Sequence, residues 1–143
     1  MRRLHPRTWT LLAITWALGI WWLLTLDRLP MPALAGRWLP SIELGFDKLA
    51  HASLFLIQAF LCARAAETRL GNRRALFLAL AICLAFGAAT ELRQRTIPTR
   101  DADPADLAAD GVGALAAAGA LPLSRRWSRA RARVQDARPA PAP

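Results

Sequence analysis

The chain has 143 residues, 55% of them hydrophobic, and carries a formal net charge of +9. Long uncharged blocks alternate with Arg-rich joints, a pattern typical of a small polytopic membrane protein rather than of a soluble core. The length allows one domain at most. A nucleic-acid-binding protein is disfavoured, because no DNA- or RNA-binding motif accompanies the arginines.

The first apolar block follows a basic head, residues 1–8. Residues 9–26 contain no charged side chain, and a helix of this length spans about 27 Å, close to the hydrocarbon thickness of a bilayer. A cleaved signal peptide is the alternative, because Ala33-Leu34-Ala35 has the form of a cleavage site. We favour an uncleaved first membrane helix, since the apolar run exceeds the usual signal length and further apolar segments follow.

Two more apolar segments follow a connection, residues 27–46, whose prolines and glycines argue against a long helix. We expect the second membrane segment at about 47–63 and the third at about 75–90. Between them lies an Arg-rich joint with a turn at Gly71-Asn72. Cys62 and Cys83 fall inside these segments, and we interpret them as small buried hydrophobic residues.

The fourth segment is expected at about 105–123. It contains a ridge of small residues, Ala109, Gly113 and Ala117, of the kind that lets membrane helices approach closely. The tail, residues 124–143, is basic and ends in alternating Pro and Ala, so we expect it to be disordered. The membrane domain is therefore predicted over residues 9–123.

The arginines predict the orientation of this all-α, four-helix membrane bundle. The head, the 64–74 joint and the tail hold 3, 4 and 6 arginines, against five arginines and the single lysine in the two other connections. The positive-inside rule then places both termini in the cytoplasm of a multi-pass bacterial inner-membrane protein. This orientation brings the polar residues of three separate stretches to one depth on the extracytoplasmic face.

Those polar residues form the candidate ligand-binding site. In a helix, Asp47 and His51 lie one above the other at i and i+4, and the only lysine of the chain is beside them. Charged groups inside a membrane segment are costly and normally face other helices. The full set of candidates is Asp47, Lys48, His51, Glu91, Gln94, Arg100, Asp106 and Asp110.

Three kinds of chemistry are compatible with these side chains. Lys48, His51 and Arg100 can hold a phosphate or carboxylate, with the carboxylates orienting the cations. His51 and Glu91 are the candidates for acid and base in an enzyme, although we assign no catalytic residue. His51, Glu91 and Asp106 are also ligand types found at divalent metal sites, but the neighbouring Lys48 disfavours a cation, so we assign no metal or other cofactor.

The motifs Asp47-Lys48-x-x-His51, Glu91-x-x-Gln94-x-x-x-Pro98-x-Arg100 and Asp106-x-x-x-Asp110-x-x-Gly113 resemble those of the VanZ-like family. This resemblance covers most of the chain, from the first helix to about Leu123. It implies a cell-envelope membrane protein of about four helices. The founding member of the family is associated with low-level resistance to the glycopeptide teicoplanin. The chain departs from the family at Asp110, where the usual residue is Asn.

Our leading hypothesis is a membrane protein with an outward-facing polar site for an anionic envelope ligand, such as a lipid-linked phosphate or a glycopeptide-related molecule, with a contribution to glycopeptide tolerance. The second is an enzyme that acts on a lipid head group. The third is a non-catalytic assembly protein, in which the small-residue ridge docks another membrane protein or a second copy. Membrane lipids are expected partners in every case.

Overall fold

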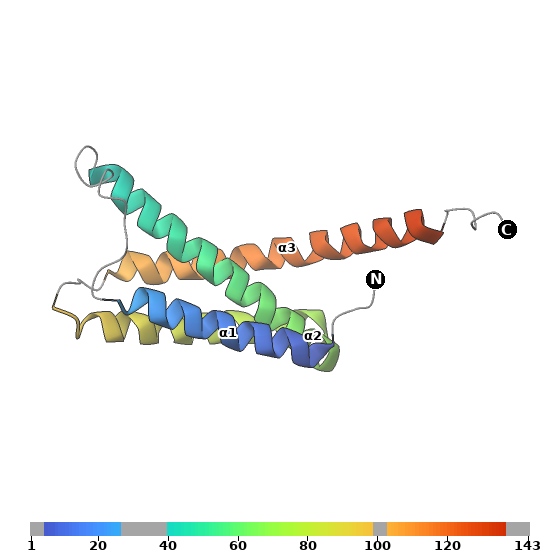
Figure 1. Cartoon of the computed structure of the whole chain (residues 1–143), viewed down its shortest axis with the longest axis horizontal. Helices are drawn as coiled ribbons and strands as arrows, with labels where there is room; N and C mark the ends of the chain where they lie inside the picture. The colour runs from blue at the N-terminus through green and yellow to red at the C-terminus, as the bar shows by residue number, and fades with distance from the viewer. Residues whose placement is uncertain (1–4, 27–39, 99–102, 137–143) are drawn as a thin grey trace.

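The computed structural model describes residues 5–26, 40–98 and 103–136, and for 40–45 and most of 123–136 it describes the backbone alone. The described residues form three helices and contain no strand (Figure 1). The expectation of an all-helical protein is therefore confirmed. The expected count of four separate helices is not, because the predicted second and third segments belong to one long helix.

The first helix, α1, spans Pro6–Leu24. It begins where Pro occupies the first helical position, which needs no free N–H. The side chain of His5 caps this end by accepting a hydrogen bond from the backbone N–H of Arg7 through Nδ1, at 3.2 Å. The helix starts and ends slightly earlier than the predicted 9–26.

The second helix, α2, spans Pro40–Gln94 but is not straight. Gly71 has φ +72° and ψ 169°, a non-helical conformation that divides α2 into two arms, 40–70 and 72–94. The second arm returns alongside the first (Figure 1), and the rings of Phe55 and Phe86 lie 5.9 Å apart across the pair. The predicted turn at Gly71-Asn72 is thus confirmed. The predicted start at Asp47 is wrong, because Pro40 can serve as a first helical residue and the helix begins there.

The third helix, α3, spans Pro104–Asp136. It runs past Leu123, with Pro122 inside it, into the predicted tail. The expectation of disorder from Ser124 onward is therefore wrong for 124–136. That stretch is rich in Arg and Ala, which are strong helix formers, and contains neither Gly nor Pro. Residues 137–143 lie outside the described part of the chain.

Small residues and aromatic rings hold the helices together. Ile20, Phe55, Cys83 and Ala117 are buried in one apolar cluster to which all three helices contribute. The helices approach closely at Gly113 of α3, where an added Cβ would lie 1.9 Å from the backbone oxygen of Ala52. The predicted small-residue ridge is therefore used at Gly113 and Ala117 for packing inside the chain.

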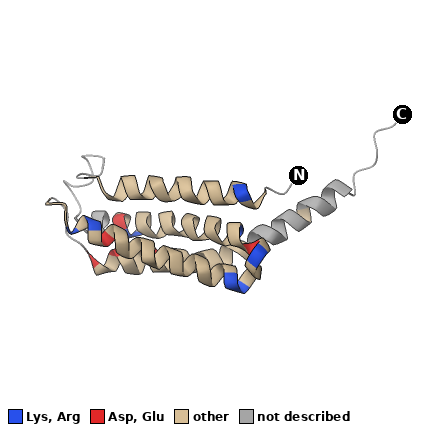
Figure 2. Ribbon diagram, turned by 90° about the horizontal axis from the view of Figure 1, so that it is seen from below, with Lys and Arg blue, Asp and Glu red and all other residues tan. Residues whose placement is uncertain are grey.

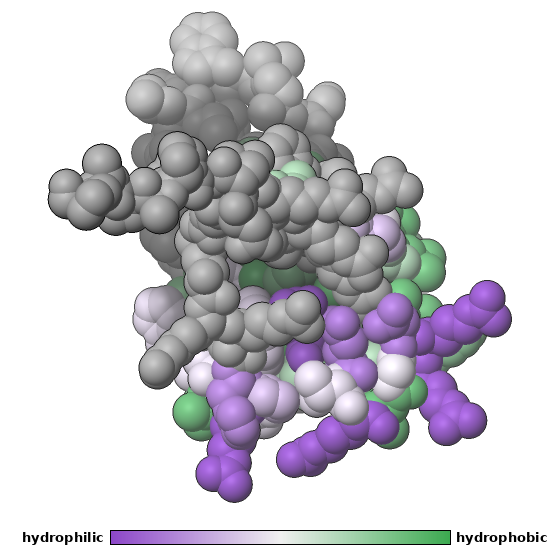
Figure 3. All heavy atoms as spheres, turned by 90° about the vertical axis from the view of Figure 1, so that its right-hand side faces the viewer, coloured by the Kyte–Doolittle hydropathy of each residue, from purple (hydrophilic) through white to green (hydrophobic). Residues whose placement is uncertain are grey.

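The outside of the helices is apolar along its length and charged at its ends. Figure 2 shows the described Lys, Arg, Asp and Glu residues gathered at the two ends, with an uncharged middle. Figure 3 faces the end that holds the turn at Gly71, where long hydrophilic side chains project outward; Arg69, Arg73 and Arg74 are exposed here. Large exposed apolar residues cover the middle, among them Leu11, Leu18, Trp22, Phe77, Val112 and Leu115.

One helix of the described chain is long and apolar enough to cross a membrane. This is Phe46–Gln94 within α2, with a mean hydropathy of 2.1 over its most apolar window, of which 33% is buried inside the protein. Most of that window therefore contacts the surroundings. An apolar surface of this extent is unusual for a soluble monomer and typical of a protein in contact with lipid.

Candidate functional site

The site lies at the end of the molecule opposite Gly71, where the start of α2, the end of α2 and the start of α3 meet (Figures 1 and 2). Its innermost contact joins His51 to Asp110. The Nδ1 atom of His51 is 2.9 Å from Oδ1 of Asp110, and each residue is only 1% exposed. Because an ionised carboxylate can only accept, the Nδ1–H of His51 donates this bond. In the neutral ring this bond fixes the tautomer, and Nε2 then carries the lone pair.

Lys48 lies one turn nearer the end of the bundle and bridges two carboxylates. Its Nζ donates to Oδ2 of Asp103 at 2.6 Å and to Oδ1 of Asp106. The carboxylate of Asp47 lies 4.0 Å away on the same helix. The single ammonium of the chain thus joins α2 to the first turn of α3. The side chain of Lys48 is 28% exposed and that of Asp103 is 42% exposed, so this ion pair lies at the surface of the protein.

Asp103 is a site residue that the sequence analysis did not select. Its Oδ1 accepts from the backbone N–H of Ala105 at 2.9 Å, which caps the N-terminus of α3, while Oδ2 binds Lys48. Hydrogen bonding from Lys48 is the largest cause that lowers the pKa of Asp103 below its ordinary value. The sequence signal was present, because Asp directly before Pro at a helix start is a typical N-cap arrangement.

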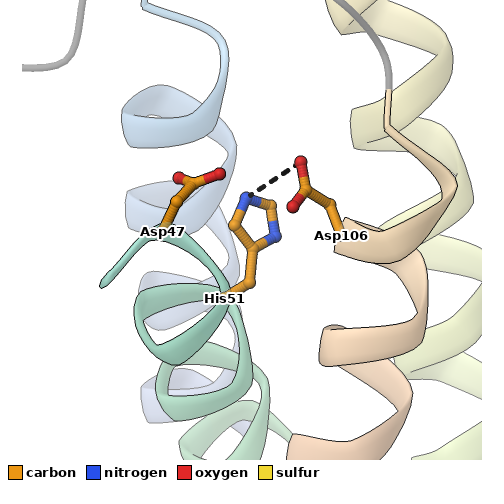
Figure 4. A group of neighbouring side chains, drawn as sticks. All are labelled: Asp47, His51 and Asp106. Atoms are coloured by element: carbon orange, nitrogen blue, oxygen red, sulfur yellow. Dashed lines mark ion pairs between the residues drawn. The ribbon is translucent and has the colours of Figure 1, made fainter. Parts of the chain in front are cut away.

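The imidazole of His51 faces two further carboxylates, those of Asp47 and Asp106 (Figure 4). Its Nε2 is 3.9 Å from Oδ2 of Asp106. One ligand atom from each of Asp47, His51 and Asp106 can be chosen so that the three lie within 4.8 Å of one another. The buried Nε2 has no hydrogen-bond partner among the described residues. The i and i+4 relation of Asp47 and His51 is thus realised, with α3 supplying a third group.

Glu91 and Gln94 come from the second arm of α2 and have different surroundings. Glu91 is 7% exposed, interacts electrostatically with Asp106 and His51, and its Oε1 has no hydrogen-bond partner among the described residues. Gln94 is 2% exposed. Its Nε2 donates to the backbone oxygen of Leu24 at 3.0 Å, so this residue ties the end of α1 to the end of α2.

The structure therefore brings together six of the eight predicted site residues: Asp47, Lys48, His51, Glu91, Asp106 and Asp110. Gln94 is at the same end but makes a contact between helices. Arg100 lies outside the described residues. The prediction that three separated stretches meet at one end of the bundle is confirmed for the residues that are described.

Carboxylates outnumber cations in this group. With His51 neutral, the described residues supply one ammonium against the carboxylates of Asp47, Glu91, Asp103, Asp106 and Asp110. Uncompensated buried charge is costly. The arrangement can therefore readily accept a cation. An anion can bind readily only if it displaces one of the carboxylates from Lys48.

Comparison with known families, with curated proteins and with solved structures found no match to this chain.

Proposed function

We propose that this protein is a VanZ-like integral membrane protein of the bacterial cell envelope, with a polar site for an envelope ligand at one end of the bundle. The observation that carries the proposal is the meeting of Lys48, His51 and Asp106 at that end of an otherwise apolar set of helices. Membrane proteins retain such costly groups where they act on a ligand, an ion or a proton.

The shape of α2 supports two of the four proposed membrane crossings. The apolar span of 49 residues is about 74 Å long at 1.5 Å per residue, more than twice the hydrocarbon thickness. Because α2 turns back at Gly71, each arm has the length of one crossing. Helices α1 and α3 supply the other two. By the positive-inside rule, the Arg-rich turn then lies in the cytoplasm, and the polar site lies on the extracytoplasmic side of the inner membrane.

Cysteine accessibility tests this topology. In a variant in which Cys62 and Cys83 are replaced by Ala, single cysteines at Asn72 and Pro98 are labelled in intact spheroplasts with a membrane-impermeant maleimide. We expect labelling at 98 from the outside and at 72 after permeabilisation alone. Labelling of both positions from the same side contradicts the two crossings of α2.

The proposed ligand is an anionic envelope molecule, such as a lipid-linked phosphate or a glycopeptide-related compound. Lys48 is the group that would receive it, because its present partner Asp103 is the most exposed member of the site and can be exchanged for a phosphate oxygen. Arg100, close to Asp103 in sequence, is the proposed second cation. A contribution to teicoplanin tolerance would follow from such binding.

A matched pair of variants tests the role of Lys48. Lys48→Gln removes the ammonium of the site, whereas Arg95→Gln removes one positive charge from an exposed residue at the same end of α2. We expect Lys48→Gln, and also Glu91→Ala, to abolish teicoplanin tolerance or growth under envelope stress at unchanged membrane expression. Wild-type behaviour of Lys48→Gln, or equal loss in Arg95→Gln, contradicts the proposal.

An enzyme is the second candidate, and one observation favours it. Two buried atoms of the site, Nε2 of His51 and Oε1 of Glu91, have no hydrogen-bond partner among the described residues. Such atoms are suited to proton transfer when a substrate arrives. Purified protein incubated with polyprenyl pyrophosphate tests this candidate: turnover that is lost in His51→Asn supports it, and no turnover counts against it.

A non-catalytic assembly partner is the third candidate. The small-residue ridge that suggested it is occupied within the chain, since Gly113 contacts Ala52 and Ala117 is fully buried. A second membrane protein or second copy would have to dock elsewhere, on the exposed apolar faces of α1 or α3. Cross-linking in native membranes tests for such a partner.

A further inference from the structure

Three side chains of the site surround a space that suits a metal ion. Asp47, His51 and Asp106 direct an oxygen, a nitrogen and an oxygen toward one another, all within 4.8 Å (Figure 4). Ligand atoms on one tetrahedral ion lie about 3.4 Å apart, given metal–ligand bonds of about 2.1 Å. The 3.9 Å between His51 and Asp106 therefore needs to close by about half an ångström. A pair at the 4.8 Å limit needs to close by about 1.4 Å.

The imidazole is prepared for a metal rather than for another hydrogen bond. Its Nε2 is buried, lacks a hydrogen-bond partner among the described residues and lies between the carboxylates of Asp47 and Asp106, 3.9 Å from Oδ2 of Asp106. The opposite nitrogen donates to Asp110 at 2.9 Å, which leaves the lone pair on Nε2. In metal sites, the ring nitrogen of histidine that does not bind the metal usually donates a hydrogen bond to a carboxylate or carbonyl in this way, which orients the ring.

Lys48, which argued against a metal in the sequence, does not occupy these ligand atoms. Its ammonium binds Oδ1 of Asp106, and the oxygen that faces His51 is Oδ2. Its other hydrogen-bond partner, Asp103, is not one of the three metal-facing groups. Asp47 is one of them, and its Oδ2 lies 4.0 Å from the ammonium, an ion pair that is longer than a hydrogen bond. Lys48 therefore orients Asp106 from one side and leaves the other side free.

The charge balance also favours a cation. With His51 neutral and all carboxylates ionised, one ammonium faces five carboxylates here, a formal charge of −4, and a divalent ion reduces it to −2. These groups are Lys48, Asp47, Glu91, Asp103, Asp106 and Asp110.

We propose that Asp47, Nε2 of His51 and Asp106 bind a divalent transition-metal ion, of which Zn²⁺ is the representative. A mixed nitrogen and oxygen ligand set favours Zn²⁺ or Mn²⁺ over Ca²⁺ and Mg²⁺, which prefer oxygen alone. Three protein ligands leave one position open to water or to a ligand oxygen. This inference does not depend on the envelope ligand proposed above, because it concerns the protein alone.

Metal titration of the purified full chain tests the proposal. Protein in detergent is stripped with EDTA, passed through a desalting column and titrated calorimetrically with Zn²⁺ and, separately, with Mg²⁺. We expect about one Zn²⁺ per chain and much weaker binding of Mg²⁺. No Zn²⁺ binding by the wild-type chain, or a preference for Mg²⁺, overturns the proposal.

A matched pair of variants locates the site. Asp47→Asn replaces a proposed ligand that is half-exposed, and Asp103→Asn neutralises a neighbouring carboxylate outside the three ligands. We expect Asp47→Asn to weaken Zn²⁺ binding by about tenfold or more, and Asp103→Asn by much less. Equal affinity in wild type and Asp47→Asn overturns the proposal.

A second ligand variant keeps the test decisive if Asp47→Asn does not fold. Asp106→Asn keeps an oxygen for Lys48 and should also lose Zn²⁺ affinity; retained affinity overturns the proposal. Size-exclusion profiles and helical circular dichroism identify the variants that remain folded.

Discussion

The Nδ1 atom of His51 donates to the carboxylate of Asp110 at 2.9 Å, although the two residues are 59 positions apart in the chain. Both are 1% exposed, and they join the first arm of α2 to α3 in the interior of the protein. This contact explains how an acidic residue is tolerated at 110, where the resembling family usually has Asn. The site requires an acceptor there, and either side chain can supply one.

Asp110→Asn should therefore keep the stability of the fold, whereas Asp110→Leu should lower it. Asn keeps a carbonyl oxygen for His51, whereas Leu leaves a buried N–H without a partner, at a cost of about 1–3 kcal/mol. Thermal unfolding of the protein in detergent measures the difference. Equal midpoints for the two variants would show that this hydrogen bond does not stabilise the fold.

The helical and apolar character of the chain could be predicted from the sequence because it depends on local composition. Uncharged blocks and an Arg-rich joint with Gly71-Asn72 at its centre are contiguous features, and the turn is found where they predict it. The convergence of Asp47, Glu91 and Asp106 at one end also followed, since alternating helices return to the same side. The helix ends were less predictable, because Pro40 can either stop a helix or begin one.

Contacts between side chains of different helices could not be predicted from the sequence, because they depend on how each helix is rotated about its axis and shifted along it. Gln94 was selected as a ligand-binding residue, and the sequence did not show that its Nε2 donates to the oxygen of Leu24, at the end of α1. Asp103 was not selected from the sequence, although it binds Lys48. In the sequence, the charge of Lys48 disfavoured a metal ion at this site. The structure shows that its ammonium binds Oδ1 of Asp106 and not the oxygen nearer to His51.

Gly113→Ala should disrupt the packing of α3 on α2. A Cβ at 113 would lie 1.9 Å from the oxygen of Ala52, and backbone on both sides prevents a side-chain adjustment. We expect a loss of roughly 2 kcal/mol or more in the free energy of unfolding, as for other overpacked positions. Thermal or denaturant unfolding in detergent measures it.

Gly119→Ala is the control for this variant. Gly119 is in the same helix, and an added Cβ there meets nothing within 4 Å. Since Ala favours a helix over Gly by about 1 kcal/mol, Gly119→Ala should be neutral or stabilising. A loss of stability at both positions would mean that a general effect of Ala in α3, rather than contact with Ala52, is responsible.

Gln94→Leu should loosen the end of α1. Removal of the amide leaves the carbonyl oxygen of Leu24 without its donor, a cost of about 1 kcal/mol. Hydrogen exchange should therefore become faster in the last turn of α1. Gln58→Leu is the control, because Gln58 is also buried in α2 but donates to Cys62 of its own helix. Faster exchange at this end in both variants would contradict a specific role for Gln94.

Gly71→Ala should strain the turn between the two arms of α2. The φ of +72° with ψ of 169° belongs to a region that residues with a Cβ almost never adopt, at a cost of about 1–3 kcal/mol. The space around Gly71 is open, so any loss comes from the backbone and not from a clash. Asn72→Ala, at the next exposed and helical position, is the control and should leave stability unchanged. We expect a lower thermal midpoint for Gly71→Ala alone. An unchanged midpoint would show that the two arms can reverse direction without a positive φ at 71.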